Sequence, residues 1–171
     1  DDFNGARQDG IGMYQVTQKG GERWSAARAY LEPARDRANL TIMTGVTAER
    51  VLFDEGRAWG VAYTQDGEAR EIRAKHAVVL ASGVFGTPQL LMLSGIGPAA
   101  HLREHGIAVR IDRPEVGENL QDHLDYVASY ETKNTQFLGQ TLTGTLNSAR
   151  ALIQWFRKRE GAMTSPYAES G

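Results

Sequence analysis

The chain has 171 residues, 41% hydrophobic and 23% charged, which is enough to bury one core and argues against a natively disordered protein. Its formal net charge of −2 argues against a nucleic-acid partner, which would favour an excess of Lys and Arg. The absence of cysteine excludes disulfides, thiolate zinc sites and cysteine nucleophiles, and it is consistent with a reducing compartment.

The first forty residues predict one short strand and a helical region. The chain starts at Asp1 with neither an initiator Met nor a signal-peptide pattern, so we expect it to be a fragment of a longer protein. Apolar alternation predicts a strand at 13–16. Ser25 is predicted to cap a helix, and Pro33 to interrupt it and start a second short turn.

Residues 40–81 predict β-structure. Period-two runs at 40–44, 49–54 and 59–65 are expected to be hairpin strands, separated by turns that contain Gly56 and Gly67. A further run at 71–74 leads into residues 77–81, whose consecutive apolar side chains favour a strand buried on both faces.

A strand–turn–helix unit follows. Residues 82–86 form a glycine-rich turn, and Pro88 is predicted at the first position of a helix that ends before Gly95. Pro98 is expected to start another helix, which Gly106 ends. Gly97 is predicted, together with Gly95, to end the first of these helices.

The last third predicts a loop, a strand and a long helix. Residues 116–122 are expected to be a loop, 125–131 a strand and 141–160 a helix. One face of that helix is apolar, and its members are Leu146, Ala149, Leu152, Ile153 and Phe156. The fold class predicted from these elements is α/β with a mixed α+β character.

The segment 81–97 bears most directly on function. A buried strand that ends in small residues allows a ligand to approach backbone N–H groups, and open α/β sheets bind nucleotides at the carboxyl ends of their strands. The alternative is an ordinary core strand followed by a glycine turn, which is common. On these residues alone both interpretations stay open.

The same segment resembles the second signature of the glucose-methanol-choline (GMC) oxidoreductases. The matching positions are Thr87, Pro88, Leu90, Leu91, Ser94, Gly95, Ile96 and Gly97. Val84 departs from the pattern, because the family usually has a smaller residue there. Residues 2–31, 113–124 and 163–171 are also similar to family segments, in the family's order.

The resemblance implies an FAD-binding, dinucleotide-type domain, here partial, over residues 1–124 and the beginning of a substrate-binding domain over 125–171. It implies adenosine contacts at Val46, through backbone groups, and at the small residues Ala81, Ser82 and Gly83. Apart from the resemblance, Val46 would be an ordinary strand residue. No catalytic or metal-binding residue is implied, because the family's phosphate-binding glycine motif and active-site His lie outside this sequence.

The function implied is that of an FAD-dependent alcohol dehydrogenase or oxidase, in which a primary alcohol, choline-like or aliphatic, loses a hydride to flavin. We expect the isolated chain to be inactive and without FAD. The alternative is a non-catalytic interaction module that retains the GMC scaffold. A location in the cytoplasm, or on the cytoplasmic side of a membrane, is expected.

Three further clusters have competing interpretations. Asn119, Asp122 and His123 could be an acid–base group, but hydrogen bonds that hold their loop are preferred. His101 and His105 have the spacing of metal ligands on a helix, but without a third ligand a solvated helix face is preferred.

Aromatic and basic residues at 155–159 complement a helix C-terminus, and a membrane-surface contact is the alternative, since some family members are membrane-associated.

Overall fold

The computed structural model describes residues 5–6, 12, 14–124, 126 and 141–165. The chain divides into two compact units. Unit 1 comprises residues 1–41 and 128–171, and unit 2 comprises residues 42–127.

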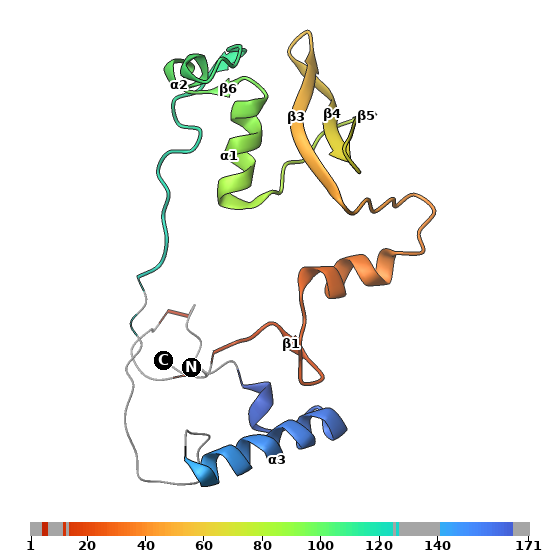
Figure 1. Ribbon diagram of the computed structural model, residues 1–171, viewed down its shortest axis with the longest axis vertical. Coiled ribbons are helices and arrows are strands. Elements are labelled where there is room, and N and C mark those ends of the chain that lie inside the picture. Colours follow the sequence, from red (N-terminus) through yellow and green to blue (C-terminus); the bar gives the residue numbers. More distant parts are fainter. Residues whose placement is uncertain (1–4, 7–11, 13, 125, 127–140, 166–171) are drawn as a thin grey trace. The chain divides into compact units, whose positions relative to one another are not determined.

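Unit 2 contains a three-stranded antiparallel sheet in the order β3-β4-β5 (Figure 1). The strands are β3 (Val46–Asp54), β4 (Arg57–Gln65) and β5 (Glu68–Arg73). Two-residue turns join them, and all four turn residues, at 55–56 and 66–67, have positive φ, as right-twisted hairpins require. The predicted hairpins are therefore confirmed. The expectation of a strand at 40–44 is wrong, because the pairing of β3 with β4 begins only at Val46.

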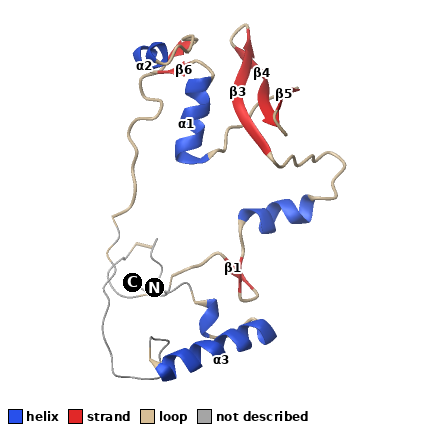
Figure 2. Ribbon diagram, in the orientation of Figure 1, coloured by secondary structure: helices blue, strands red, loops and turns tan. Residues whose placement is uncertain are grey.

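Helical structure follows the sheet in the same unit (Figure 2). Its elements are α1 (Gly83–Leu93), β6 (Ile96–Gly97), α2 (Ala99–Glu104) and β7 (Ile111–Asp112), and β6 pairs with β7 in parallel. Gly95, with φ of +84°, ends α1 as predicted, and Gly106 follows α2. The core includes Val51 of β3, Leu90 of α1 and Leu102 of α2, which is fully buried.

Two expectations for this region are wrong. Residues 77–81 are not a strand, and Val79 is 84% exposed, because within 14–124 no strand lies beside them to supply the pairing that a doubly buried strand needs. Pro88 lies inside α1, which begins five residues earlier, at Gly83. The glycine-rich turn predicted at 82–86 is thus mostly the first turn of α1.

The N-terminal part of unit 1 is a short hairpin and two helical turns. The hairpin consists of β1 (Gln18–Lys19) and β2 (Glu22–Arg23), and the turns are the π-helix η1 (Ala27–Leu31) and the 3-10 helix η2 (Glu32–Ala34). Residues 14–16 are not a strand, since pairing begins at Gln18. Ser25 Oγ accepts the Arg28 N–H at 3.4 Å, which agrees with the predicted cap, and Pro33 lies in η2.

The C-terminal part of unit 1 is α3 (Leu142–Lys158) followed by the 3-10 helix η3 (Ala162–Thr164). The helix predicted at 141–160 is confirmed, and Thr141 Oγ1 caps it by accepting the Gly144 N–H at 3.0 Å. The strand predicted at 125–131 lies outside the described residues except for Tyr126. Among the described helices, none is both long and apolar enough to span a bilayer.

Aromatic and charged side chains connect α3 to the β1–β2 hairpin. Trp155 Nε1 donates to Gly21 O at 2.9 Å, and the Arg159 guanidinium lies 4.1 Å from the centre of the Trp155 ring. Glu22 forms ion pairs with Arg159 at 3.1 Å and with Arg28 at 2.7 Å. Trp155 and Arg159 therefore make packing contacts within unit 1.

Candidate functional site

The turn that precedes α1 leaves its backbone open to a ligand. Ala81, Ser82 and Gly83 are all exposed. Gly83 has φ of +79°, which other residues rarely adopt, and a Cβ added there would meet no atom within 4 Å. The residues predicted to contact adenosine thus border free space, and the turn is not packed against the core of unit 2.

The conformation of this turn is fixed by residues one helical turn later. The Ser82 N–H donates to Thr87 Oγ1 at 3.1 Å, and the Ser82 side chain does not cap the helix. A Cβ at Gly86 would lie 2.9 Å from Ser82 Cβ, so a glycine there makes room for the turn. Thr87 occupies the Ser82 N–H, whereas the N–H groups of the neighbouring Ala81 and Gly83 remain available to a ligand.

Val46, the fourth predicted contact, is the first residue of β3. The chain enters the strand through Gly45, whose φ is +67°, and Val46 pairs with Gln65 of β4. Since β3 is an edge strand of the described sheet, it pairs on one side only. The half-buried Val46 is therefore held by β4 on one side, and the other side of β3 has no strand beside it in the described sheet.

A buried serine connects β3 to α1. Ser94 Oγ accepts the Val51 N–H at 2.8 Å and donates to Leu90 O at 2.5 Å. Both elements run in the same direction in Figure 1, so β3 and α1 begin at the same end of unit 2. Ser94 thereby joins β3 to the C-terminal end of α1.

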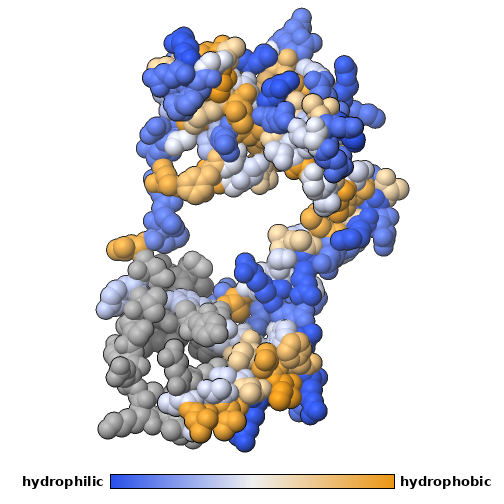
Figure 3. Space-filling view, in the orientation of Figure 1, coloured by the Kyte–Doolittle hydropathy of each residue, from blue (hydrophilic) through white to orange (hydrophobic). Residues whose placement is uncertain are grey.

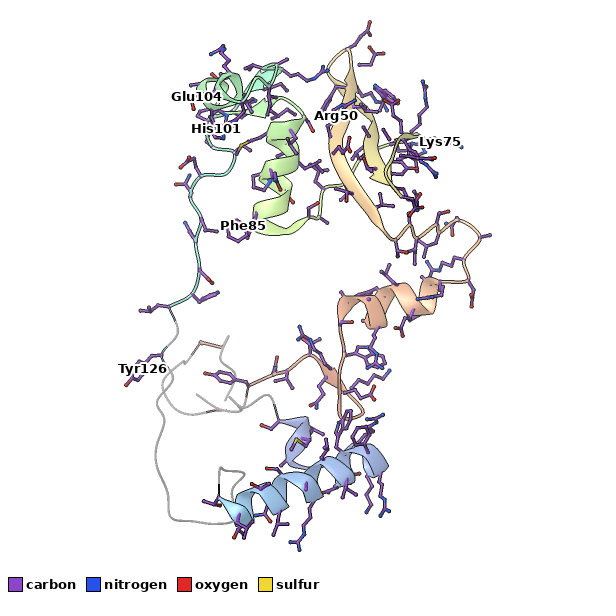
Figure 4. All side chains as sticks on the ribbon, viewed as in Figure 1. Arg50, Lys75, Phe85, His101, Glu104 and Tyr126 are labelled. Atoms are coloured by element: carbon purple, nitrogen blue, oxygen red, sulfur yellow. The ribbon has the colours of Figure 1, made fainter. Side chains whose placement is uncertain are left out.

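A groove of about 1030 Å³ lies beside the first turn of α1. Its walls come from α1, α2 and the segment 116–121, and they include Phe85 and Met92. Figure 4 shows Phe85 at the N-terminal end of α1 and His101 on α2. None of the four predicted adenosine contacts lines this groove, which begins at the residue after Gly83.

The polar clusters singled out in the sequence have local contacts. The rings of His101 and His105 meet edge to face with centroids 4.7 Å apart, and both residues are exposed. Asp122 Oδ1 accepts the N–H of His123 at 2.8 Å, which agrees with the preferred role of holding the loop. Among the described residues no group of three potential ligands could bind a metal ion.

The sequence did not indicate the structural roles of two residues in this site. Thr87 and Ser94 both belong to the recognised signature, but their hydrogen bonds to Ser82 and Val51 were not anticipated. The signal for Thr87 is a hydroxyl in the second turn of a helix whose N-terminus lacks a capping side chain. Ser94 gives no comparable local signal, because its partner lies 43 residues away.

Comparison with known sequences identifies related proteins. The family model described as GMC oxidoreductase matches residues 1–125. The alcohol dehydrogenase (acceptor) of Pseudomonas putida is 47% identical over 172 residues, which cover 99% of this chain and 31% of that protein. The oxygen-dependent choline dehydrogenase of Rhizobium johnstonii is 48% identical over 126 residues, which cover 74% of this chain and 23% of that protein.

A solved structure shows the same fold. An FAD-dependent oxidoreductase from Chaetomium thermophilum matches with a TM-score of 0.77 and 30% identity, over 91% of this chain and 28% of that one. The chain therefore spans about a third or less of the length of the proteins that it matches.

Proposed function

Because the chain belongs to the GMC oxidoreductase family, we propose that it supplies the adenosine side of an FAD site in an enzyme that oxidises a primary alcohol, choline-like or aliphatic. The names of its relatives, an alcohol dehydrogenase and choline dehydrogenases, support this substrate class. FAD, when bound, supplies the hydride acceptor. Residues of this chain hold and orient the nucleotide end of that cofactor.

The open turn at Gly83 is the observation on which the proposal rests. A flat adenosine group needs backbone atoms without intervening side chains, and Ala81 and Gly83 present them. Val46 contributes backbone groups at the start of β3, and Ser82 forms the middle of the turn, held by Thr87. The described residues therefore fit the adenosine half of FAD.

The proposed role of the chain is binding and orientation of the cofactor. No residue of this chain is predicted to be catalytic, so proton removal from the alcohol is assigned to parts of the enzyme outside residues 1–171. The isolated chain is accordingly expected to lack alcohol-oxidising activity. Retention of the GMC scaffold for a non-catalytic interaction is the competing function, and flavin content separates the two.

The first experiment fills the turn in the full-length protein. Gly83→Val adds a side chain where the structure has free space and φ of +79°, so we expect at least a tenfold loss of FAD affinity. Gly67→Val is the matched control, because Gly67 has φ of +81°, also has free space, and lies in the β4–β5 turn. Bound flavin is measured by its visible absorbance after gel filtration.

Equal flavin loss in both variants would mean that backbone strain alone is responsible, and it would remove the support for an adenosine contact at Gly83. The second experiment records flavin bleaching when a primary alcohol is added without oxygen. Bleaching in the full-length protein is expected. A full-length protein that binds no flavin would favour the interaction module, and bleaching by the 171-residue chain alone would refute the division of roles proposed above.

A further inference from the structure

The first turn of α1 lacks the cap that its N-terminal serine could provide. Ser82 is at the N-cap position, where a serine hydroxyl ordinarily accepts the N–H of the second or third helical residue. The Ser82 side chain makes no such bond, and its backbone, with φ of −85° and ψ of 14°, is outside the extended region that a capping serine adopts. The N–H groups of the first turn therefore receive no oxygen from Ser82.

One hydroxyl holds Ser82 in this conformation. In a capping box, the N-cap N–H donates to a Glu or Gln at the third helical position, but α1 has Phe85 there. Thr87, at the fifth position, accepts the Ser82 N–H at 3.1 Å. Thr87 and Gln89 are the only polar side chains of α1, and Figure 3 shows apolar side chains in the upper part of the view, where α1 lies, among hydrophilic ones.

Neighbouring residues limit the movement of both partners. Thr87 is half-buried, is branched at Cβ and precedes Pro88, and each of these properties restricts its rotamers or its backbone. A Cβ at Gly86 would lie 2.9 Å from Ser82 Cβ, so Ser82 lies against the helix at that position. The hydroxyl of Thr87 is therefore held close to the Ser82 N–H before any ligand binds.

We propose that Thr87 is a positioning residue for the nucleotide end of FAD, a role that rests on the FAD site proposed above. By accepting the Ser82 N–H, Thr87 prevents Ser82 from rotating into the capping conformation, in which its hydroxyl would bond to the Phe85 N–H. That rotation would change the shape of the turn at Ala81 and Gly83. A turn already held in its binding shape loses less conformational freedom when the cofactor binds.

The test uses the full-length protein freed of flavin and compares FAD with FMN, which has the flavin ring and ribityl phosphate but lacks the adenosine part. Thr87→Val keeps the side-chain shape without the acceptor, so FAD should bind about fivefold more weakly and FMN equally well. Thr87→Ser keeps the acceptor and should stay within about twofold for FAD. Thr145→Val on α3 is the matched control, because Thr145 Oγ1 also bonds to backbone, to Thr141 O at 3.0 Å, and it should leave FAD affinity unchanged.

Two further measurements separate positioning from general destabilisation. The exposed Ser82 N–H can bond to water in Thr87→Val, and Ser82 becomes free to cap α1, so the thermal midpoint should change little while FAD affinity falls. Hydrogen exchange of the Ser82 amide, measured without flavin, should be faster in Thr87→Val than in Thr87→Ser.

Equal weakening of FAD and FMN in Thr87→Val, or a large fall in its thermal midpoint, would overturn the proposal in favour of a purely structural role. A loss of FAD affinity as large in Thr87→Ser as in Thr87→Val would also overturn it, since the acceptor would then be irrelevant. If Gly83→Val weakens FAD binding and Thr87→Val does not, the positioning role fails while the adenosine contact stands. If neither variant weakens FAD binding, the proposed FAD site fails with it.

Discussion

Removal of the Ser94 hydroxyl should loosen β3 from α1. Ser94 is 4% exposed, and its Oγ is the hydrogen-bond acceptor for the N–H of Val51, which is itself 5% exposed. In Ser94→Ala, Leu90 O keeps a partner, because the backbone N–H of residue 94 also donates to it at 3.1 Å. The unsatisfied group is therefore the Val51 N–H.

The magnitude follows from that one donor. A buried N–H left without a partner costs about 1–3 kcal/mol, and we expect about 2 kcal/mol of lost unfolding free energy. For a chain of this size the loss lowers the thermal midpoint by about 4–8 °C. Ser148→Ala is the control: its hydroxyl donates to the carbonyl four residues earlier, Gly144 O at 2.9 Å, but it lies on the surface helix α3. It should cost less than about 0.5 kcal/mol.

Two assays separate this mechanism from general destabilisation. Urea unfolding gives the free energy of each variant, and hydrogen exchange reports the Val51 amide itself. We expect that amide to exchange about thirtyfold faster in Ser94→Ala. Unchanged exchange at Val51, or an equal loss of stability in Ser148→Ala, would refute the assignment of Ser94 as the connection between β3 and α1.

Two further variants test the packing in each unit. Gly95→Ala places a Cβ 2.5 Å from Ala108 O at φ of +84°, so urea unfolding should show a loss of about 3 kcal/mol or more; a loss below about 1 kcal/mol would contradict the tight packing after α1. Trp155→Phe removes the donor to Gly21 O and should cost about 1 kcal/mol in thermal unfolding, and no change would mean that this bond does not hold α3 to the hairpin.

Elements whose signals are local were predictable from the sequence. The Asp66-Gly67 turn joins two alternating runs, and the structure has a hairpin there with the turn residues at positive φ. Thr141 and the apolar period that follows it predict α3, whose bounds agree to within about two residues. Gly95 and Gly106 end the helices expected before them.

Features that depend on distant partners were not predictable. Residues 77–81 have the composition of a doubly buried strand, but burial requires neighbouring strands that composition does not report. The period of α3 identifies its apolar side, yet the choice of Gly144 and Ala151 as the buried side follows from contacts with Gly21 and Glu22. In the same way, the family resemblance implies adenosine contacts at Val46 and at residues 81–83, but it does not indicate the bond that joins Ser94 to β3.

The discontinuity of unit 1 has a consequence for biosynthesis. Residues 42–127 are consecutive, so unit 2 can complete its internal contacts soon after they leave the ribosome. The β1–β2 hairpin is translated earlier, but its partners on α3 follow more than 130 residues later, as the bond from Trp155 to Gly21 shows. During translation the β1–β2 hairpin is therefore synthesised before α3 is present, and unit 2, which lies between them in the sequence, can fold before the hairpin contacts α3.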